Sequence, residues 1–326
     1  MRQEVRTEMT SLTIGIPVYN EIDNLPELVR RLDAVLSKLG GGPHELLFVD
    51  DGSADGSAKW LEQAAGHDPR IRLVRLSRNF GHQAALTAAV DHARGDALVL
   101  MDADLQDAPE AIPRFVAEYE RGYEVVYAIR VARKEGALLR ACYRLFYWLI
   151  ARLSDTPLPE GSGDFGLLSR RAVEALRLHR EHHRYLRGLR TLIGFRQVGI
   201  EVEREARHAG TSRYGFRGLV RLALNGLFAF SVVPIRLATL IGLFAIGGSF
   251  VYAIYVLWAR LVLQQTPQGF TTLILAMVFL AGVQLLFLGI IGEYVGRIYE
   301  EAKGRPIYIT DKVEDGTEPR PGAKSV

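Results

Sequence analysis

Two aspartates, Asp102 and Asp104, follow the apolar run ALVLM at positions 97–101. Residues two apart in an extended segment point to the same side, so the two carboxylates are expected to lie together. Paired carboxylates repel each other unless they share a cation or one of them is protonated. Mg²⁺ and Mn²⁺ prefer oxygen ligands and bind phosphates at such sites. The pattern predicts a site for Mg²⁺ or Mn²⁺; the alternative is a pair of solvated loop aspartates.

Polar residues also end three other expected strands, at 11–19, 45–51 and 71–77. The residues at these ends are Asn20 and Glu21, then Asp50 and Asp51, then Asn79. Helices are expected between the strands, at 24–39, 57–65 and 82–93. At 24–39 the apolar residues recur at helical spacing. Alternating strands and helices predict an open, mostly parallel α/β sheet. Ligands bind at the carboxyl ends of such strands, so these residues should line one cleft.

The composition excludes several classes of protein. The chain has 326 residues, of which 48% are hydrophobic and 24% charged, which excludes a wholly disordered protein. The formal net charge is only +3, from 40 basic and 37 acidic side chains, so we expect no nucleic-acid partner. The single cysteine excludes an intramolecular disulfide framework.

Apolar residues concentrate near the C-terminus. No charged residue lies between Arg236 and Arg260, or between Arg260 and Glu293. Each interval exceeds the ~20 apolar residues that a membrane helix needs. We predict a transmembrane hairpin at 233–298, with spans at about 236–260 and 269–293; the alternative is a pair of buried core helices. Basic residues flank the outer ends of both spans, which predicts a multi-pass protein of the inner (cell) membrane with the catalytic domain and both termini cytoplasmic.

Two further segments have the composition of helices that lie in the lipid interface. Residues 137–152 and 216–232 combine aliphatic and aromatic side chains with spaced arginines. The alternative for both is packing against the sheet. The sequence predicts a disordered N-terminus at 1–10 and a polar cytoplasmic tail at 299–326, disordered from residue 311 onwards.

Four motifs together resemble glycosyltransferase family 2: PVYNE at 17–21, VDDGSADGS at 49–57, RNFGHQAAL at 78–86 and DADLQDAPE at 102–110. The last resembles the polyprenyl-phosphate branch of the family, and the hairpin resembles its bacterial two-span members. The resemblance implies a GT-A fold, Rossmann-like with a mostly parallel sheet, over residues 11–215. It also implies inverting, metal-dependent transfer of a sugar from a nucleotide-sugar donor to a polyprenyl phosphate acceptor at the lipid bilayer.

The resemblance also implies roles for individual residues. Asp102 and Asp104, with Gln106, would hold the metal against the donor diphosphate. Arg130 matches the family's phosphate-binding arginine and would act in catalysis with Asp104. The residues implied to bind the nucleotide-sugar are Pro17, Tyr19, Glu21, Asp50, Asp51, Asp102, Ala103, Arg207 and Arg213. The family often has lysine at the position of Arg213. Here the planar guanidinium group of arginine replaces the compact ammonium group of lysine, and the positive charge is kept.

Asp164, in GSGDFGLLSRRA at 161–172, corresponds to an aspartate near the family's acceptor. It is a candidate base, but a phosphate monoester has a second pKa of about 6 and needs little deprotonation at neutral pH. Asp164 could instead orient a basic partner or the metal. The glycines around it predict a tight loop. His82 is interpreted as a polar contact or helix cap, and the histidines at 179–183 as a solvated face.

Three functions remain open. Transfer from UDP-glucose to undecaprenyl phosphate is favoured, with GDP-mannose as the alternative donor. A processive polysaccharide synthase would carry a QxxRW motif and more spans, which we do not find. A non-catalytic scaffold that binds sugar nucleotides at the membrane would be free to lose Asp104 or Asp164, and the chain has both. The sequence leaves a homo-oligomer open.

Overall fold

The computed structural model describes residues 11–131, 162–182, 184–203, 233–262 and 269–316. The chain divides into two compact units. One contains the sheet and includes residues 306–326; the other contains the C-terminal helices within 214–305. The interfacial segments expected at 137–152 and 216–232, and the N-terminal residues 1–10, lie outside the described residues.

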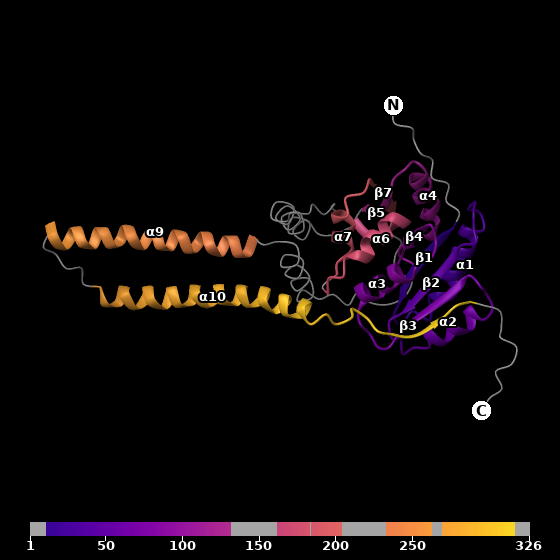
Figure 1. Ribbon diagram of the computed structural model, residues 1–326, viewed down its shortest axis with the longest axis horizontal. Helices are drawn as coiled ribbons and strands as arrows, with labels where there is room; N and C mark the ends of the chain where they lie inside the picture. Colours follow the sequence, from indigo (N-terminus) through magenta and orange to yellow (C-terminus); the bar gives the residue numbers. More distant parts are fainter. Residues whose placement is uncertain (1–10, 132–161, 183, 204–232, 263–268, 317–326) are drawn as a thin grey trace. The chain divides into compact units, whose positions relative to one another are not determined.

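The sheet has eight strands in the order β7-β5-β6-β4-β1-β2-β3-β8 (Figure 1). Strands β1, β2, β3, β4, β5 and β7 run in one direction, and β6 and β8 run against it. Their bounds are β1 Leu12–Val18, β2 Glu45–Asp50, β3 Ile71–Leu76, β4 Ala97–Leu100, β5 Val125–Val131, β6 Ser162–Ser169, β7 Gln197–Glu203 and β8 Thr310–Glu314. The prediction of a mostly parallel α/β sheet is confirmed.

Helices cover both faces of the sheet. On one face, α1 (Leu25–Leu36), α2 (Ser57–Ala65) and α4 (Ile112–Glu120) bury their apolar sides in one core cluster. On the other face, α3 (His82–His92), α6 (Arg170–Leu178) and α7 (Leu186–Leu192) contribute to a second cluster. A short 3₁₀ helix, η1 (Pro109–Ala111), precedes α4. β1 and β4 are buried along their whole length, and β2 is buried from Leu46 to Asp50, because both of their faces are covered.

Strand β6 corrects the prediction of a glycine-rich loop around Asp164. Residues 162–169 run antiparallel between β4 and β5, and Phe165, Leu167 and Leu168 are buried there. Gly166 allows the strands to approach, since a Cβ at this position would lie 2.9 Å from Tyr127 Cα and closer still to the backbone oxygen of Val126. The glycine thus serves strand packing, whereas a turn was expected.

We expect Gly166→Ala to lower the free energy of unfolding by about 3 kcal/mol, the upper end for overpacking a rigid site. The added methyl group meets backbone atoms, which cannot move aside as a flexible side chain can. Gly40→Ala is the matched control, because a Cβ there meets no atom within 4 Å. Thermal unfolding of the detergent-solubilised full chain measures both variants. Equal midpoints for the two would contradict the assigned packing.

Strand β8 corrects the prediction of a disordered tail. From residue 306 onwards the chain belongs to the sheet unit again, and Thr310–Glu314 pairs antiparallel with β3. Asp315 forms an ion pair with the buried Arg72, with 2.6 Å between Oδ1 and Nε. The Tyr308 hydroxyl donates a hydrogen bond to Asp91 at 3.0 Å. β8 is polar because it is an edge strand with an exposed face.

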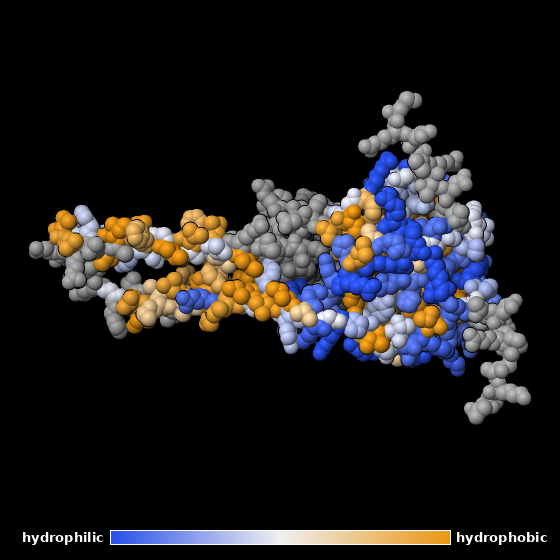
Figure 2. All heavy atoms as spheres, viewed as in Figure 1, coloured by the Kyte–Doolittle hydropathy of each residue, from blue (hydrophilic) through white to orange (hydrophobic). Residues whose placement is uncertain are grey.

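The second unit contains α9 (Val233–Val262) and α10 (Phe270–Ala302). Each is long and apolar enough to cross a membrane, over Ala238–Val256 and Phe279–Ala302 respectively. Neither apolar stretch is buried inside the protein, which contradicts the alternative of core helices. Figure 2 shows the apolar surface continuing along both helices. Exposed apolar helices of this length indicate membrane association.

Candidate active site

The loops that follow β1 and β2 are joined by hydrogen bonds. Asn20 lies in the left-handed region at φ 56°, and its side-chain oxygen accepts a hydrogen bond from the Ala54 amide at 2.8 Å. Its own amide donates to the Ser53 hydroxyl at 2.9 Å, and the Glu21 amide donates to the Ser57 hydroxyl at 3.1 Å. The two loops therefore form one rigid rim at the carboxyl ends of their strands.

Five of the residues expected around the nucleotide lie at this rim: Pro17, Tyr19, Glu21, Asp50 and Asp51. Pro17 is buried in β1 beside Val49, and Val18 lies beside Asp50 in the strand register. The Tyr19 side chain is 41% exposed at the end of β1. An exposed aromatic ring at the end of a buried strand is suited to contact with a ligand.

Asp51 holds the start of helix α3. Its two carboxylate oxygens accept hydrogen bonds from the amides of Phe80 at 2.7 Å and Gly81 at 2.9 Å. Burial raises the pKa of Asp51 above its usual value, although these two amides work in the opposite direction. This carboxylate therefore fixes the position of His82, the first residue of α3. The sequence did not reveal this structural role.

The aspartates of the DxD motif lie directly beyond β4. Asp104 is buried, and its Oδ1 accepts a hydrogen bond from the Gln106 amide at 3.1 Å. Leu105 adopts the left-handed conformation at φ 59°, which turns the chain back after Asp104. Asp102 is more exposed, and its Oδ1 lies 3.5 Å from Nε2 of His82.

The two carboxylates fit a metal that binds together with a phosphate ligand. Among the described residues, no group of three or more His, Cys, Asp or Glu side chains could hold a metal ion. Mg²⁺ in nucleotide sites is held by one or two carboxylates and completes its coordination with phosphate oxygens and water. Asp102 and Asp104, with the Gln106 amide oxygen, provide hard oxygen donors of that kind.

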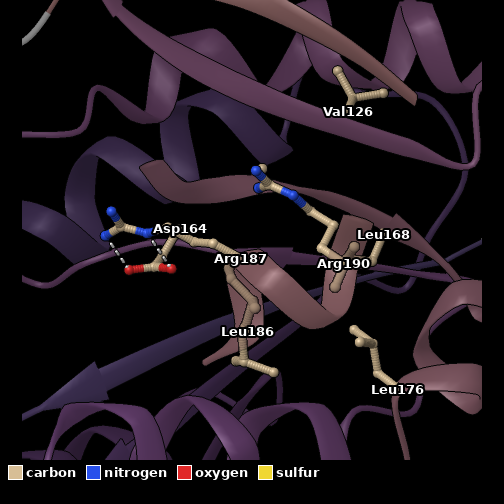
Figure 3. A pocket seen from close by; sticks show the side chains of 9 residues that line it. Val126, Asp164, Leu168, Leu176, Leu186, Arg187 and Arg190 are labelled. Carbon is tan, nitrogen blue, oxygen red and sulfur yellow. Dashed lines mark hydrogen bonds and ion pairs between the residues drawn. The ribbon is translucent and has the colours of Figure 1, made fainter. Parts of the chain in front are cut away.

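Asp164 and Arg187 form a bidentate ion pair with two hydrogen bonds (Figure 3). Nε of Arg187 donates to Oδ1 at 2.8 Å, and Nη2 donates to Oδ2 at 2.6 Å. Burial alone would raise the pKa of Asp164, but the hydrogen bonds and charges of Arg187 and His82 outweigh burial and hold it well below its usual range. Asp164 is consequently a poor proton acceptor, and orienting a basic partner fits the structure better than the base role.

His82 lies between the two groups of charged residues. Its Nε2 is 3.5 Å from Asp102 and 3.8 Å from Oδ2 of Asp164. Burial lowers the pKa of His82, but the two carboxylates outweigh burial and raise it. The interpretation of His82 as a polar contact is confirmed, and the contact joins the DxD motif to the Asp164–Arg187 pair.

Some expected site residues are placed only in part or not at all. Arg130 belongs to β5, and its backbone lies beside Val202 of β7. Arg207 and Arg213 lie outside the described residues. Sequence reasoning missed Arg187, which the sequence places in a run of basic residues, HRYLRGLR, that gives no sign of a buried partner.

The mostly parallel sheet with an acidic edge is the arrangement that the motifs imply for a GT-A glycosyltransferase domain. Residues 13–177 match the sequence model of glycosyl transferase family 2, and residues 233–298 match that of the GtrB C-terminal hairpin. The chain therefore belongs to glycosyl transferase family 2 and is a glycosyltransferase with the GtrB hairpin at its C-terminus.

Curated relatives match over nearly the whole chain. The uncharacterized glycosyltransferase YkcC of Bacillus subtilis is 40% identical over 92% of this chain and 93% of its own length. The SfII prophage-derived bactoprenol glucosyl transferase of Shigella flexneri is 36% identical over 94% of this chain and 99% of its own length. Among solved structures, the mannosyltransferase PcManGT from Pyrobaculum calidifontis in complex with GDP-Man and Mn²⁺ is 20% identical, with a TM-score of 0.42 over 67% of this chain and 61% of that one.

Proposed function

We propose that the protein transfers a sugar, glucose from UDP-glucose in the favoured case, to polyprenyl phosphate at the cytoplasmic face of the membrane. The proposal depends on one observation: Asp102 and Asp164 both lie next to Nε2 of His82. The same chain has two helices that are long and apolar enough to span a membrane. A DxD carboxylate suits a nucleotide diphosphate, and a paired arginine beside it suits a second anion. Relatives named bactoprenol glucosyl transferase, 36% identical over 94% of the chain, support the same choice of acceptor.

On the donor side, Asp102, Asp104 and Gln106 would hold Mg²⁺ or Mn²⁺ against the diphosphate. When bound, the metal supplies charge stabilisation to the leaving nucleoside diphosphate. Pro17, Tyr19, Glu21, Asp50, Asp51 and Ala103 would surround the nucleotide, with Arg130, Arg207 and Arg213 adding positive charge at the phosphates. Stabilising the charge that develops on the leaving group is the main catalytic contribution expected of such residues.

On the acceptor side, an oxygen of the polyprenyl phosphate attacks the anomeric carbon of the sugar. The new bond joins that carbon to the acceptor oxygen, and the bond between the carbon and the donor phosphate oxygen breaks. Attack from the face opposite the leaving group inverts the anomeric configuration. The acceptor is a phosphate monoester with a second pKa of about 6, so its dianion is the nucleophile at neutral pH and no protein base is required.

The location also follows from charge. Basic residues flank the outer ends of α9 and α10, which favours a cytoplasmic catalytic domain with both termini on the same side. A cytoplasmic domain reaches soluble nucleotide sugars, and the hairpin keeps the enzyme at the membrane that contains its acceptor.

A radiolabel assay tests the proposal. The purified full chain is incubated with undecaprenyl phosphate, Mg²⁺ or Mn²⁺, and either UDP-[¹⁴C]glucose or GDP-[¹⁴C]mannose. We expect a butanol-extractable glucolipid that is labile to mild acid and whose sugar has the inverted anomeric configuration. A mannolipid would instead establish the alternative donor. A long polymer would show a processive synthase, and no product with a panel of nucleotide sugars would favour the scaffold.

A further inference from the structure

Arg187 is held by Asp164 in a way that leaves one side of its guanidinium group available. Nε and Nη2 both donate to Asp164, so the third nitrogen, Nη1, points away from that carboxylate (Figure 3). No side chain or carbonyl of the described residues accepts a hydrogen bond from Nη1. The Asp164 side chain is 6% exposed and the Arg187 side chain 25% exposed, so the carboxylate is buried behind an arginine that solvent can reach.

A second arginine adds positive charge beside this pair. Arg190, one turn further along α7, is 5% exposed, stacks 4.3 Å from the Tyr127 ring centroid and donates to the Gly163 oxygen at 3.2 Å. Its Nε and Nη2 have no acceptor among the described residues. Burial lowers the pKa of Arg190 to about 10, so the group stays charged at neutral pH. Among the described residues Arg190 has no carboxylate as a hydrogen-bond acceptor, so its charge beside the Asp164–Arg187 pair favours an anion there.

The same residues line part of a small, mostly apolar cavity. Asp164, Arg187 and Arg190 line it together with apolar side chains of β4, β5 and β6. His82 connects Asp164 to Asp102, and the Gln83 side-chain oxygen accepts a hydrogen bond from the Leu186 amide at 3.1 Å. The start of α3 therefore fixes α7, and Arg187 with it, close to the DxD carboxylate.

We propose that Arg187 binds the phosphate group of the acceptor and that Asp164 is the positioning residue that aims it. This inference rests on the proposed function, since it assigns the acceptor site of the same reaction. Asp164 holds the guanidinium plane by one edge, and the other edge donates to the phosphate oxygens of the incoming dianion. The surplus charge of Arg190 stabilises the bound phosphate from behind. The phosphate oxygen that Arg187 leaves free attacks the anomeric carbon, and the nucleoside diphosphate departs.

Steady-state kinetics with varied undecaprenyl phosphate and varied donor test the inference. A hydrogen bond between charged groups contributes about 1.5–3 kcal/mol, so we expect Arg187→Lys and Arg187→Gln to raise the acceptor KM on the order of 10- to 100-fold. The donor KM should change less than about two-fold, since losing binding to one substrate alone moves only its own KM. Inorganic phosphate, as a competitor of the acceptor, should lose inhibitory strength in the same variants. Arg171→Ala is the control, because Arg171 is 73% exposed and pairs with Glu124 on the surface.

Asp164→Asn separates positioning from base catalysis. If Asp164 acts through Arg187, Asp164→Asn raises the acceptor KM, and the double variant with Arg187→Gln is no worse than Arg187→Gln alone. A fall in kcat with an unchanged acceptor KM would overturn the inference in favour of a base. A raised donor KM in the Arg187 variants would overturn it in favour of a donor site. A wild-type chain that transfers no sugar to polyprenyl phosphate would instead refute the proposed function, while retained phosphate binding through Arg187 would still be measurable by calorimetry.

Discussion

Replacing Asp104 with alanine is expected to abolish sugar transfer while the protein remains folded and membrane-bound. Asp104 is buried at the end of β4, and one of its oxygens already accepts the Gln106 amide. This carboxylate is one of the groups proposed to hold the metal that binds with the donor. Without it the leaving diphosphate loses its main charge stabilisation, and we expect a fall in kcat on the order of 10³-fold or more.

Asp104→Asn makes the same experiment sharper. The amide keeps the volume and can still accept the Gln106 hydrogen bond, so only the negative charge is removed. Binding of Mn²⁺ in the presence of UDP, followed by electron paramagnetic resonance, should weaken in both variants. Asp33→Ala is the matched control, since Asp33 is a surface carboxylate on α1, 54% exposed and paired with Arg70. Turnover that persists in Asp104→Asn would refute the proposed metal role.

Strands β1 to β4 and the helices between them could be predicted because each carries a complete local signal. The strands are short apolar runs that end in polar residues, and helix α1 shows Leu25, Leu28 and Leu32 on one side. β6 was missed because its glycines resemble a loop; only its place between β4 and β5 shows that Gly166 permits close packing. β8 was missed because TDKVE is polar, and its pairing with β3 bridges more than 200 residues of sequence.

The site residues also divide into those that could be predicted from the sequence and those that could not. Asp102 and Asp104 could be identified because their chemistry depends on neighbours in the sequence. Arg187 could not, since its partner Asp164 lies 23 residues earlier, and His82, which lies 3.8 Å from Asp164, is more than 100 residues earlier. Asp164 remained a candidate base in the sequence because its partner Arg187 could not be recognised there. An isolated carboxylate can accept a proton, whereas a buried one that is fixed by an arginine favours its charged form.

Deleting residues 306–326 is expected to destabilise the catalytic sheet, although none of them belongs to the matched family 2 region at 13–177. The deletion removes β8 from the edge of β3, together with the hydrogen bond from the Ser77 amide to the Ile309 oxygen. It also leaves the buried Arg72 without Asp315 and Asp91 without Tyr308. At about 1 kcal/mol for each lost hydrogen bond, the loss amounts to several kcal/mol. A lower thermal midpoint, on the order of 10 °C, should follow in detergent.

Two point variants locate the effect within the strand. Asp315→Ala removes the ion pair to Arg72, whose side chain is only 8% exposed, and should reproduce part of the loss. Lys312→Ala changes a side chain that is 56% exposed and, within the described part of the chain, forms an ion pair with Glu314 in the same strand, so its midpoint should match the wild type. β3 leads to the loop that carries Asn79 and to the start of α3. The deletion should therefore also lower kcat, even at temperatures at which the truncated protein is still folded. A truncated chain with unchanged midpoint and activity would show that β8 contributes nothing to the sheet, and that the chain beyond α10 is dispensable.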